Sequence, residues 1–114
     1  MGVLRDLFRG LERWRSAYET HGIDTLTTPD GVEWSIHDLE YLYTVAMETL
    51  PPSRSRAIDL CLVQGYREWE AAEMMGVSIT NPVSMYATKG LQKLVRLIES
   101  GQLPRFGTTE GEAA

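Results

Sequence analysis

Polar and cationic side chains recur along one face of a predicted helix in the last third of the chain. Ser84 and Thr88 are four residues apart, and so are Met85, Lys89 and Lys93, which places all five on one side of a helix. Hydroxyl groups can exchange hydrogen bonds with base edges, and lysines pair with phosphate oxygens. This combination favours nucleic-acid binding over catalysis.

The helix that must carry these side chains is predicted over residues 82–99. Asn81 and Pro82 form an N-cap and first-turn pair, because proline fixes φ and needs no backbone partner there. Gly101 is a natural stop. The buried face opposite the polar one is defined by apolar or small residues at spacings of three and four: Val83, Ala87, Gly90, Leu91, Leu94, Leu97 and Ile98.

A shorter helix is predicted just upstream, over residues 67–75. Gly76 ends it at a position where positive φ favours glycine. Two helices joined by a tight glycine turn, with the cations on the second, are typical of a helix-turn-helix. The periodicity alone fits a helical hairpin in a small bundle equally well.

A series of short motifs spans residues 50–98. They are the Leu50-Pro51-Pro52 opening, an aliphatic helix ending in Val63-Gln64-Gly65, Glu70-Ala71-Ala72-Glu73 leading into Gly76-Val77-Ser78, and the spacing of Val83, Gly90 and Leu94. As a set, they resemble the fourth conserved region of bacterial sigma-70-type factors, which recognises the upstream promoter element. With the helix that precedes it, the resemblance covers more than half of the chain.

The resemblance implies that the helix over residues 82–99 enters the major groove of DNA. Its base-facing residues would be Thr80, Asn81, Ser84, Met85 and Thr88. Its phosphate-binding residues would be Lys89, Lys93 and Arg54 or Arg56. Asn81 is the most informative of these, since asparagine can bond adenine at two positions when it is not used as a cap.

Double-stranded DNA is therefore the expected partner. RNA polymerase or another transcription protein is a second one, because the same fold in the family contacts polymerase. The chain has no room for the sigma region that binds the polymerase clamp, so we expect a small bacterial or phage transcription regulator and not a complete sigma factor. Two alternatives remain: a phage DNA-packaging (small terminase-like) recognition subunit, which would form a homo-oligomeric ring, and a protein-binding module that has lost DNA binding and uses Met85 and Tyr86.

Composition and charge limit the other function classes. The 114 residues, 43% hydrophobic and 24% charged, suit one globular domain, and no apolar run approaches a membrane span, so we expect a cytoplasmic protein with no membrane partner. The net charge is −5, but residues 17–50 hold seven acids and no lysine or arginine, whereas residues 1–16 hold four arginines against two acids. Cys61 with only His21 and His37 cannot form a zinc site, and we expect a packed thiol, no cofactor and no enzyme.

The predicted fold is all-α, with five helices ending in the helix-turn-helix. Residues 1–20 form an amphipathic helix that docks on the other helices or on a second copy of the chain. Alternatively, this helix binds a membrane surface or a partner. Residues 21–35 are a connector in which a small β-hairpin can form near 25–34. The sigma-like domain spans residues 36–100, with helices from Ile36 and from Ser53 to Val63, and Tyr66 and Trp69 sealing its core. Residues 101–114 are expected to be a flexible tail.

Overall fold

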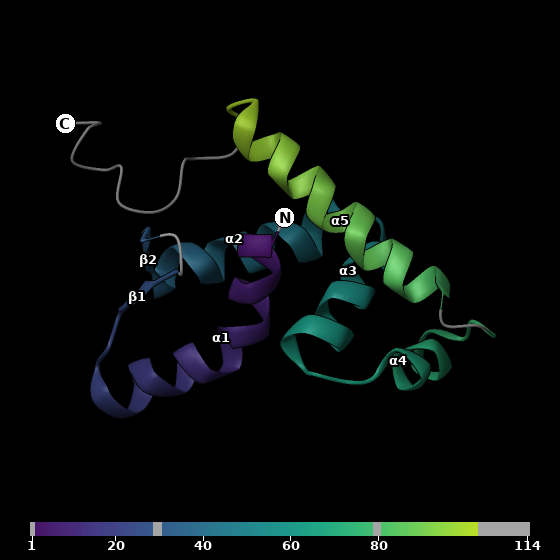
Figure 1. Ribbon diagram of the computed structural model, residues 1–114, viewed down its shortest axis with the longest axis horizontal. Coiled ribbons are helices and arrows are strands. Elements are labelled where there is room, and N and C mark those ends of the chain that lie inside the picture. The colour runs from purple at the N-terminus through teal and green to yellow at the C-terminus, as the bar shows by residue number, and fades with distance from the viewer. Residues whose placement is uncertain (1, 29–30, 79–80, 103–114) are drawn as a thin grey trace.

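The computed structural model describes residues 2–28, 31–78 and 81–102. These residues form five α-helices, one π-helical segment and one two-stranded antiparallel sheet (Figure 1). In chain order, the elements are α1 (Gly2–His21), β1 (Thr25–Thr27), β2 (Glu33–Ser35), α2 (Ile36–Thr49), α3 (Pro52–Ala57), η1 (Ile58–Val63), α4 (Glu68–Met75) and α5 (Asn81–Glu99). The predicted all-α fold of five helices with a small hairpin is confirmed. The predicted tail beyond Gln102 lies outside the described residues.

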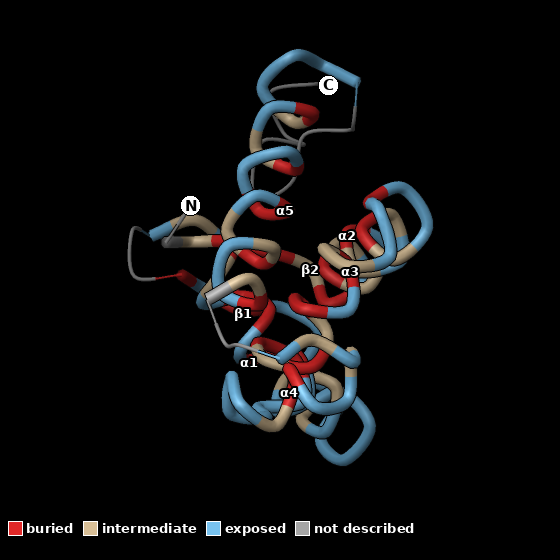
Figure 2. The backbone as a smooth tube through the Cα atoms, turned by 90° about the vertical axis from the view of Figure 1, so that its right-hand side faces the viewer, coloured by how far each residue is buried: buried red, intermediate tan, exposed pale blue. Residues whose placement is uncertain are grey.

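A single core forms where α1, α2, η1 and α5 meet. α1 packs against α2 and η1, and α5 packs most extensively against α3. The predicted apolar faces of α2 and α5 are buried, down to residues with no solvent exposure such as Leu39 and Leu91, except that Ile98 at the end of α5 is half-buried. Figure 2 shows α5 buried on the side toward the other helices and exposed on the outside. α1 is docked as well, through Leu4, Leu7, Phe8 and Leu11.

The hairpin covers one end of this core. Leu26 of β1 pairs with Trp34 of β2, and both side chains are buried while their strand neighbours are more exposed. An isolated two-stranded hairpin is only marginally stable, so packing of these two residues on the helices holds it in place. The turn residues 29–30 lie outside the described part of the chain.

Three aromatic side chains are more exposed than the sequence predicted. Tyr66 and Trp69 were expected to seal the core, yet they are 37% and 53% exposed. α4 buries Ala71 and Ala72, and Trp69, two residues before Ala71, lies on nearly the opposite side of the helix from it. Tyr18, expected on the apolar face of α1, is 41% exposed, and its ring makes a T-shaped contact with the ring of His37, with 5.2 Å between the ring centres.

The helix boundaries follow their capping residues. The Ser35 hydroxyl accepts a hydrogen bond of 3.1 Å from the backbone N–H of His37, which starts α2 as predicted. Pro52 occupies the first turn of α3. The predicted regular helix from Ser53 to Val63 differs from the structure, because its second half is the π-helical η1. Gly65, at φ 79°, then closes this segment.

A polar cluster ties α1, α2 and η1 together at one edge of the core. The Arg15 guanidinium donates two hydrogen bonds of 2.7 and 2.8 Å to the Glu40 carboxylate, which raises the pKa of Arg15 and keeps it charged. The same guanidinium lies 5.1 Å from the centre of the Tyr43 ring. The Asp59 carboxylate accepts hydrogen bonds from the Tyr43 hydroxyl at 2.7 Å and from the Gln64 amide at 2.8 Å. The Asp59 carboxylate thereby links the start of η1 both to α2, through Tyr43, and to the residue that follows η1, Gln64.

Tyr43 should titrate later than an ordinary tyrosine. Burial, followed by its hydrogen bond to Asp59, raises the pKa of Tyr43 to about 12. Since the neutral phenol is favoured in the folded chain, this contribution to stability is present below about pH 10 and is lost as the pH rises through about 12. Tyrosinate absorbance measured against pH, with circular dichroism to confirm folding, should show a late step that Tyr43→Phe removes. Tyr41 is an exposed neighbour on α2, and Tyr41→Phe should leave the late step in place. A native protein that shows no late step would contradict the raised pKa of Tyr43.

Candidate functional site

α4 and α5 are joined by a turn whose geometry depends on one glycine. Gly76 has φ 75°, in the left-handed region. Its N–H donates to the Glu73 carbonyl, and the N–H of Val77 donates to the Ala72 carbonyl at 3.0 Å. These two bonds satisfy carbonyls at the end of α4 that would otherwise lack partners. The chain is thereby turned toward α5, and Figure 1 shows α4 below the N-terminal half of that helix.

The exposed face of α5 brings together most of the predicted site residues. Ser84, Met85, Lys89 and Lys93 are exposed, and Thr88 is half-buried. A shallow hollow of about 430 Å³ runs along this face, lined by Ser84, Met85, Thr88, Lys89 and Gln92. Thr80 and the side chain of Asn81 lie outside the described residues, so their predicted roles stay predictions. Hydroxyl, amide, thioether and ammonium groups therefore share one open surface.

The two predicted arginines of α3 lie in different surroundings. The Cβ atom of Arg54 is close to α5, 3.4 Å from where a Cβ at Gly90 would be. Arg56 donates a hydrogen bond of 3.3 Å from Nη2 to the backbone carbonyl of Met74, near the end of α4. Arg54 therefore flanks α5, whereas Arg56 helps to fasten α4 to α3.

Three further arginines, which the sequence reasoning did not assign to the site, lie on the other side of α5. Arg5 of α1 donates a hydrogen bond of 3.4 Å from Nη2 to the Thr88 hydroxyl. Arg5, Arg9 and Arg67 line a hollow of about 340 Å³ that also reaches Ser84. The surplus of positive charge in residues 1–16 was the one sequence feature that could have pointed to Arg5 and Arg9. Periodicity showed that Arg5 and Arg9 face away from the apolar side of α1, but not which element lies beside them.

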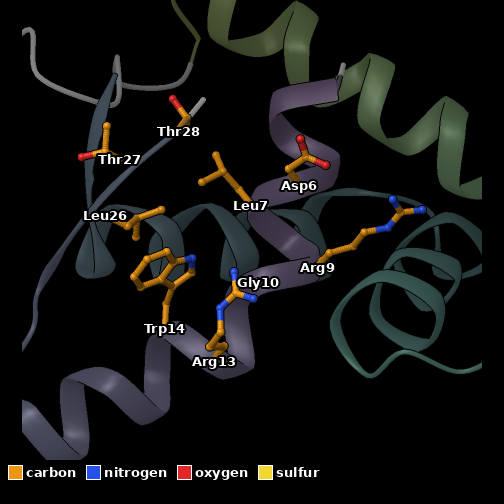
Figure 3. Close-up of a pocket in the computed structure, with 9 residues that line it drawn as sticks. All are labelled: Asp6, Leu7, Arg9, Gly10, Arg13, Trp14, Leu26, Thr27 and Thr28. Atoms are coloured by element: carbon orange, nitrogen blue, oxygen red, sulfur yellow. The ribbon is translucent and has the colours of Figure 1, made fainter. Parts of the chain in front are cut away.

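A third hollow, of about 410 Å³, lies between α1 and the hairpin (Figure 3). Trp14 leans over the backbone at Gly10, where a Cβ atom would lie only 2.9 Å from the indole Nε1. The Arg13 guanidinium lies 5.5 Å from the centre of the same ring, in cation–π contact. Asp6 balances part of the arginine charge here. Trp14 and Arg13 thus engage each other, and we regard this hollow as a packing feature of α1 and the hairpin.

Cys61 is half-buried and lines the arginine hollow beside α5. Burial, followed by the nearby Glu68 carboxylate, raises the pKa of its thiol. The neutral thiol is a poor nucleophile and a poor metal ligand. In the part of the chain that the structure describes, no three histidine, cysteine or acidic side chains are arranged to hold a metal ion.

Comparisons of the chain with protein-family models, with curated proteins and with solved structures find no match. The resemblance to sigma region 4 therefore stays a prediction based on the motifs themselves. Over the described residues, no helix combines the length and apolar character needed to cross a membrane.

Proposed function

We propose that this protein binds double-stranded DNA through α5 and acts as a small transcription regulator, not as an enzyme. The observation that carries the proposal is the outer face of α5, where hydroxyl and ammonium groups lie together on a helix supported from behind by α3 and α4. α5 has 19 residues and is therefore about 28 Å long. A helix of this kind fits the major groove of B-DNA, which is about 12 Å wide.

The side chains divide into two groups in this proposal. Ser84, Thr88 and Met85, in the N-terminal half of α5, would read base edges, together with Thr80 and Asn81. Lys89, Lys93 and Arg54 would bind backbone phosphates on either side of α5. Arg56 is bonded to the Met74 carbonyl, but its guanidinium has further N–H donors that can bind a phosphate oxygen.

The acidic residues do not oppose this arrangement. Most acids of residues 17–50 belong to the hairpin and α2, and α2 packs against α1, α3 and β2. In Figure 1, the hairpin lies on the opposite side of the molecule from the N-terminal half of α5. Glu40 is also paired with Arg15. The Debye length is about 8 Å at physiological salt, and exposed charges farther apart than this are largely screened from each other. A net charge of −5 for the whole chain is therefore compatible with a local cationic surface.

The proposal predicts salt-dependent DNA binding that involves Lys89 and Lys93. Fluorescent duplex DNA would be titrated with protein at several salt concentrations. The plot of log affinity against log salt should be steep, and the Lys89→Ala, Lys93→Ala double variant should reduce its slope by roughly two. The Lys89→Arg, Lys93→Arg double variant keeps both charges and should keep the slope. Failure of the native protein to bind at low salt would refute the proposed function.

Met85 favours a second candidate function, that of a protein-binding module. Its side chain is 47% exposed in the middle of the polar face of α5, and Tyr86 beside it is half-buried. Exposed methionine is common at adaptable binding surfaces. Under this alternative, Met85→Ala weakens a protein complex and leaves DNA affinity unchanged. Under the main proposal, Met85→Ala alters affinity for a specific DNA site without changing the salt slope.

A further inference from the structure

The hollow beside α5 is built by four elements that are distant in the sequence. α1 contributes Arg5 and Arg9, η1 contributes Cys61 and Leu62, and α5 contributes Val83, Ser84 and Ala87. Tyr66, Arg67 and Glu68 come from the start of α4 and the segment before it. The base of the hollow is thus largely apolar or small, and its charged groups come from α1 and the start of α4.

Positive charge dominates this hollow. Its lining contains three arginines and one acid, Glu68. Within the described part of the chain, the ion pairs are those of Arg15, so neither Arg9 nor Arg67 is paired with a carboxylate. Both side chains are exposed, whereas Arg5 is half-buried and bonded to Thr88. Arg9 and Arg67 are therefore available to an anionic ligand.

The hollow is continuous with the outer face of α5. Ser84 lines both the arginine hollow and the hollow along α5, and Arg5 joins α1 directly to Thr88. A ligand that lies along α5 therefore extends past Arg9 and Arg67. For duplex DNA with α5 in the major groove, the group beside the helix is the sugar-phosphate backbone.

We propose that Arg9 and Arg67, supported by Arg5, form a phosphate-binding site that holds one DNA strand on the α1 side of α5. This inference rests on the proposed function and extends it. The N-terminal helix is then part of the DNA-binding surface and not only a support for the core. The guanidinium groups suit the role, because each can donate two parallel hydrogen bonds to a phosphate.

The salt dependence of DNA binding tests this site. The Arg9→Ala, Arg67→Ala double variant should bind duplex DNA more weakly at every sequence, with a salt slope reduced by roughly two. Arg13→Ala is the matched control on the same helix, because Arg13 lines the hollow with Trp14 and not the one beside α5; Figure 3 shows Arg9 and Arg13 extending in different directions. Arg9→Ala alone should lower the slope by about one, and Arg13→Ala should leave it unchanged.

The outcomes separate this inference from the proposed function. If the native protein binds DNA and depends on Lys89 and Lys93, while the Arg9 and Arg67 variant keeps the native slope, the inference is wrong and the proposed function stands. If native protein does not bind at all, both are wrong. Equal losses from Arg9→Ala and Arg13→Ala would indicate a general charge effect and would also overturn the inference.

Cys61 gives an independent measurement, because it lines the same hollow and is the one cysteine in the chain. The rate at which a maleimide reagent modifies Cys61 would be measured at fixed pH, with and without saturating duplex DNA. A DNA strand across Arg9 and Arg67 should slow the reaction several-fold. In the Arg9→Ala, Arg67→Ala variant, this protection should be lost at DNA concentrations that still saturate the protein. An unchanged rate in the native complex would refute the site.

Discussion

Replacing Phe8 with alanine should lower the free energy of unfolding by about 3–5 kcal/mol. The Phe8 side chain has no solvent exposure and lies in the core between α1 and the elements against which α1 packs. Removing its ring leaves a cavity that the surrounding helices can fill only in part. The loss would be measured by urea unfolding followed by circular dichroism.

Arg13→Ala is the control for the Phe8 experiment, since it changes an exposed residue of the same helix and, losing only a surface cation–π contact with Trp14, should shift stability by no more than about 1 kcal/mol. A loss of less than about 1 kcal/mol for Phe8→Ala would mean that α1 is peripheral to the fold. The sequence left open whether residues 1–20 dock on the domain or bind a membrane or a partner. The buried face of α1 accounts for docking, and its exposed arginines then become available for another role.

Replacing Gly90 with leucine should destabilise the protein by about 1–3 kcal/mol or more, because it overfills the contact of α5 with η1 and the end of α2. A Cβ at Gly90 would lie 2.8 Å from Cδ1 of Ile58 and 3.2 Å from Cδ1 of Leu50. Leu50 follows α2 and Ile58 begins η1, and both are buried, so a longer side chain must push α5 away from these two elements. We expect DNA affinity to fall too, because α5 would shift relative to Arg54.

Gly90→Ala separates crowding from backbone effects. Alanine favours a helix over glycine by about 1 kcal/mol, and its one carbon meets terminal methyl groups that can move slightly. We therefore expect Gly90→Ala to lose less stability than Gly90→Leu. Thermal unfolding of both variants would measure this order. A leucine variant as stable as the native protein would contradict the close packing of α5 at Gly90 on Leu50 and Ile58.

Local sequence signals predicted the elements of this fold well. Ser35 and Gly76 act through their own backbone neighbourhoods, and the apolar periodicities of α2 and α5 are properties of single helices. Such features are encoded within a few residues. The outer face of α5 was predictable for the same reason, since a buried stripe defines the face opposite to it.

The rest of the site depends on contacts between distant residues. Arg5 and Thr88 are 83 positions apart, and no local pattern indicates that α1 lies beside α5. The exposure of Trp69 is also a tertiary property, because it depends on which face of α4 meets the core. The π-helical form of η1 had no sequence signal that we can identify. Helix faces were thus predictable, whereas their neighbours were not.

The docking of α1 on η1 has a consequence for folding during synthesis. The ribosome completes the apolar face of α1, at Leu11, about 50 residues before it completes η1, which at bacterial and eukaryotic elongation rates of about 5–20 residues per second takes roughly 3–10 s. During that interval, the nascent chain lacks one of the two elements that cover Leu4, Leu7, Phe8 and Leu11 in the finished fold. We expect chaperones that bind short apolar helices to engage the chain at this stage and to release it once η1 has emerged.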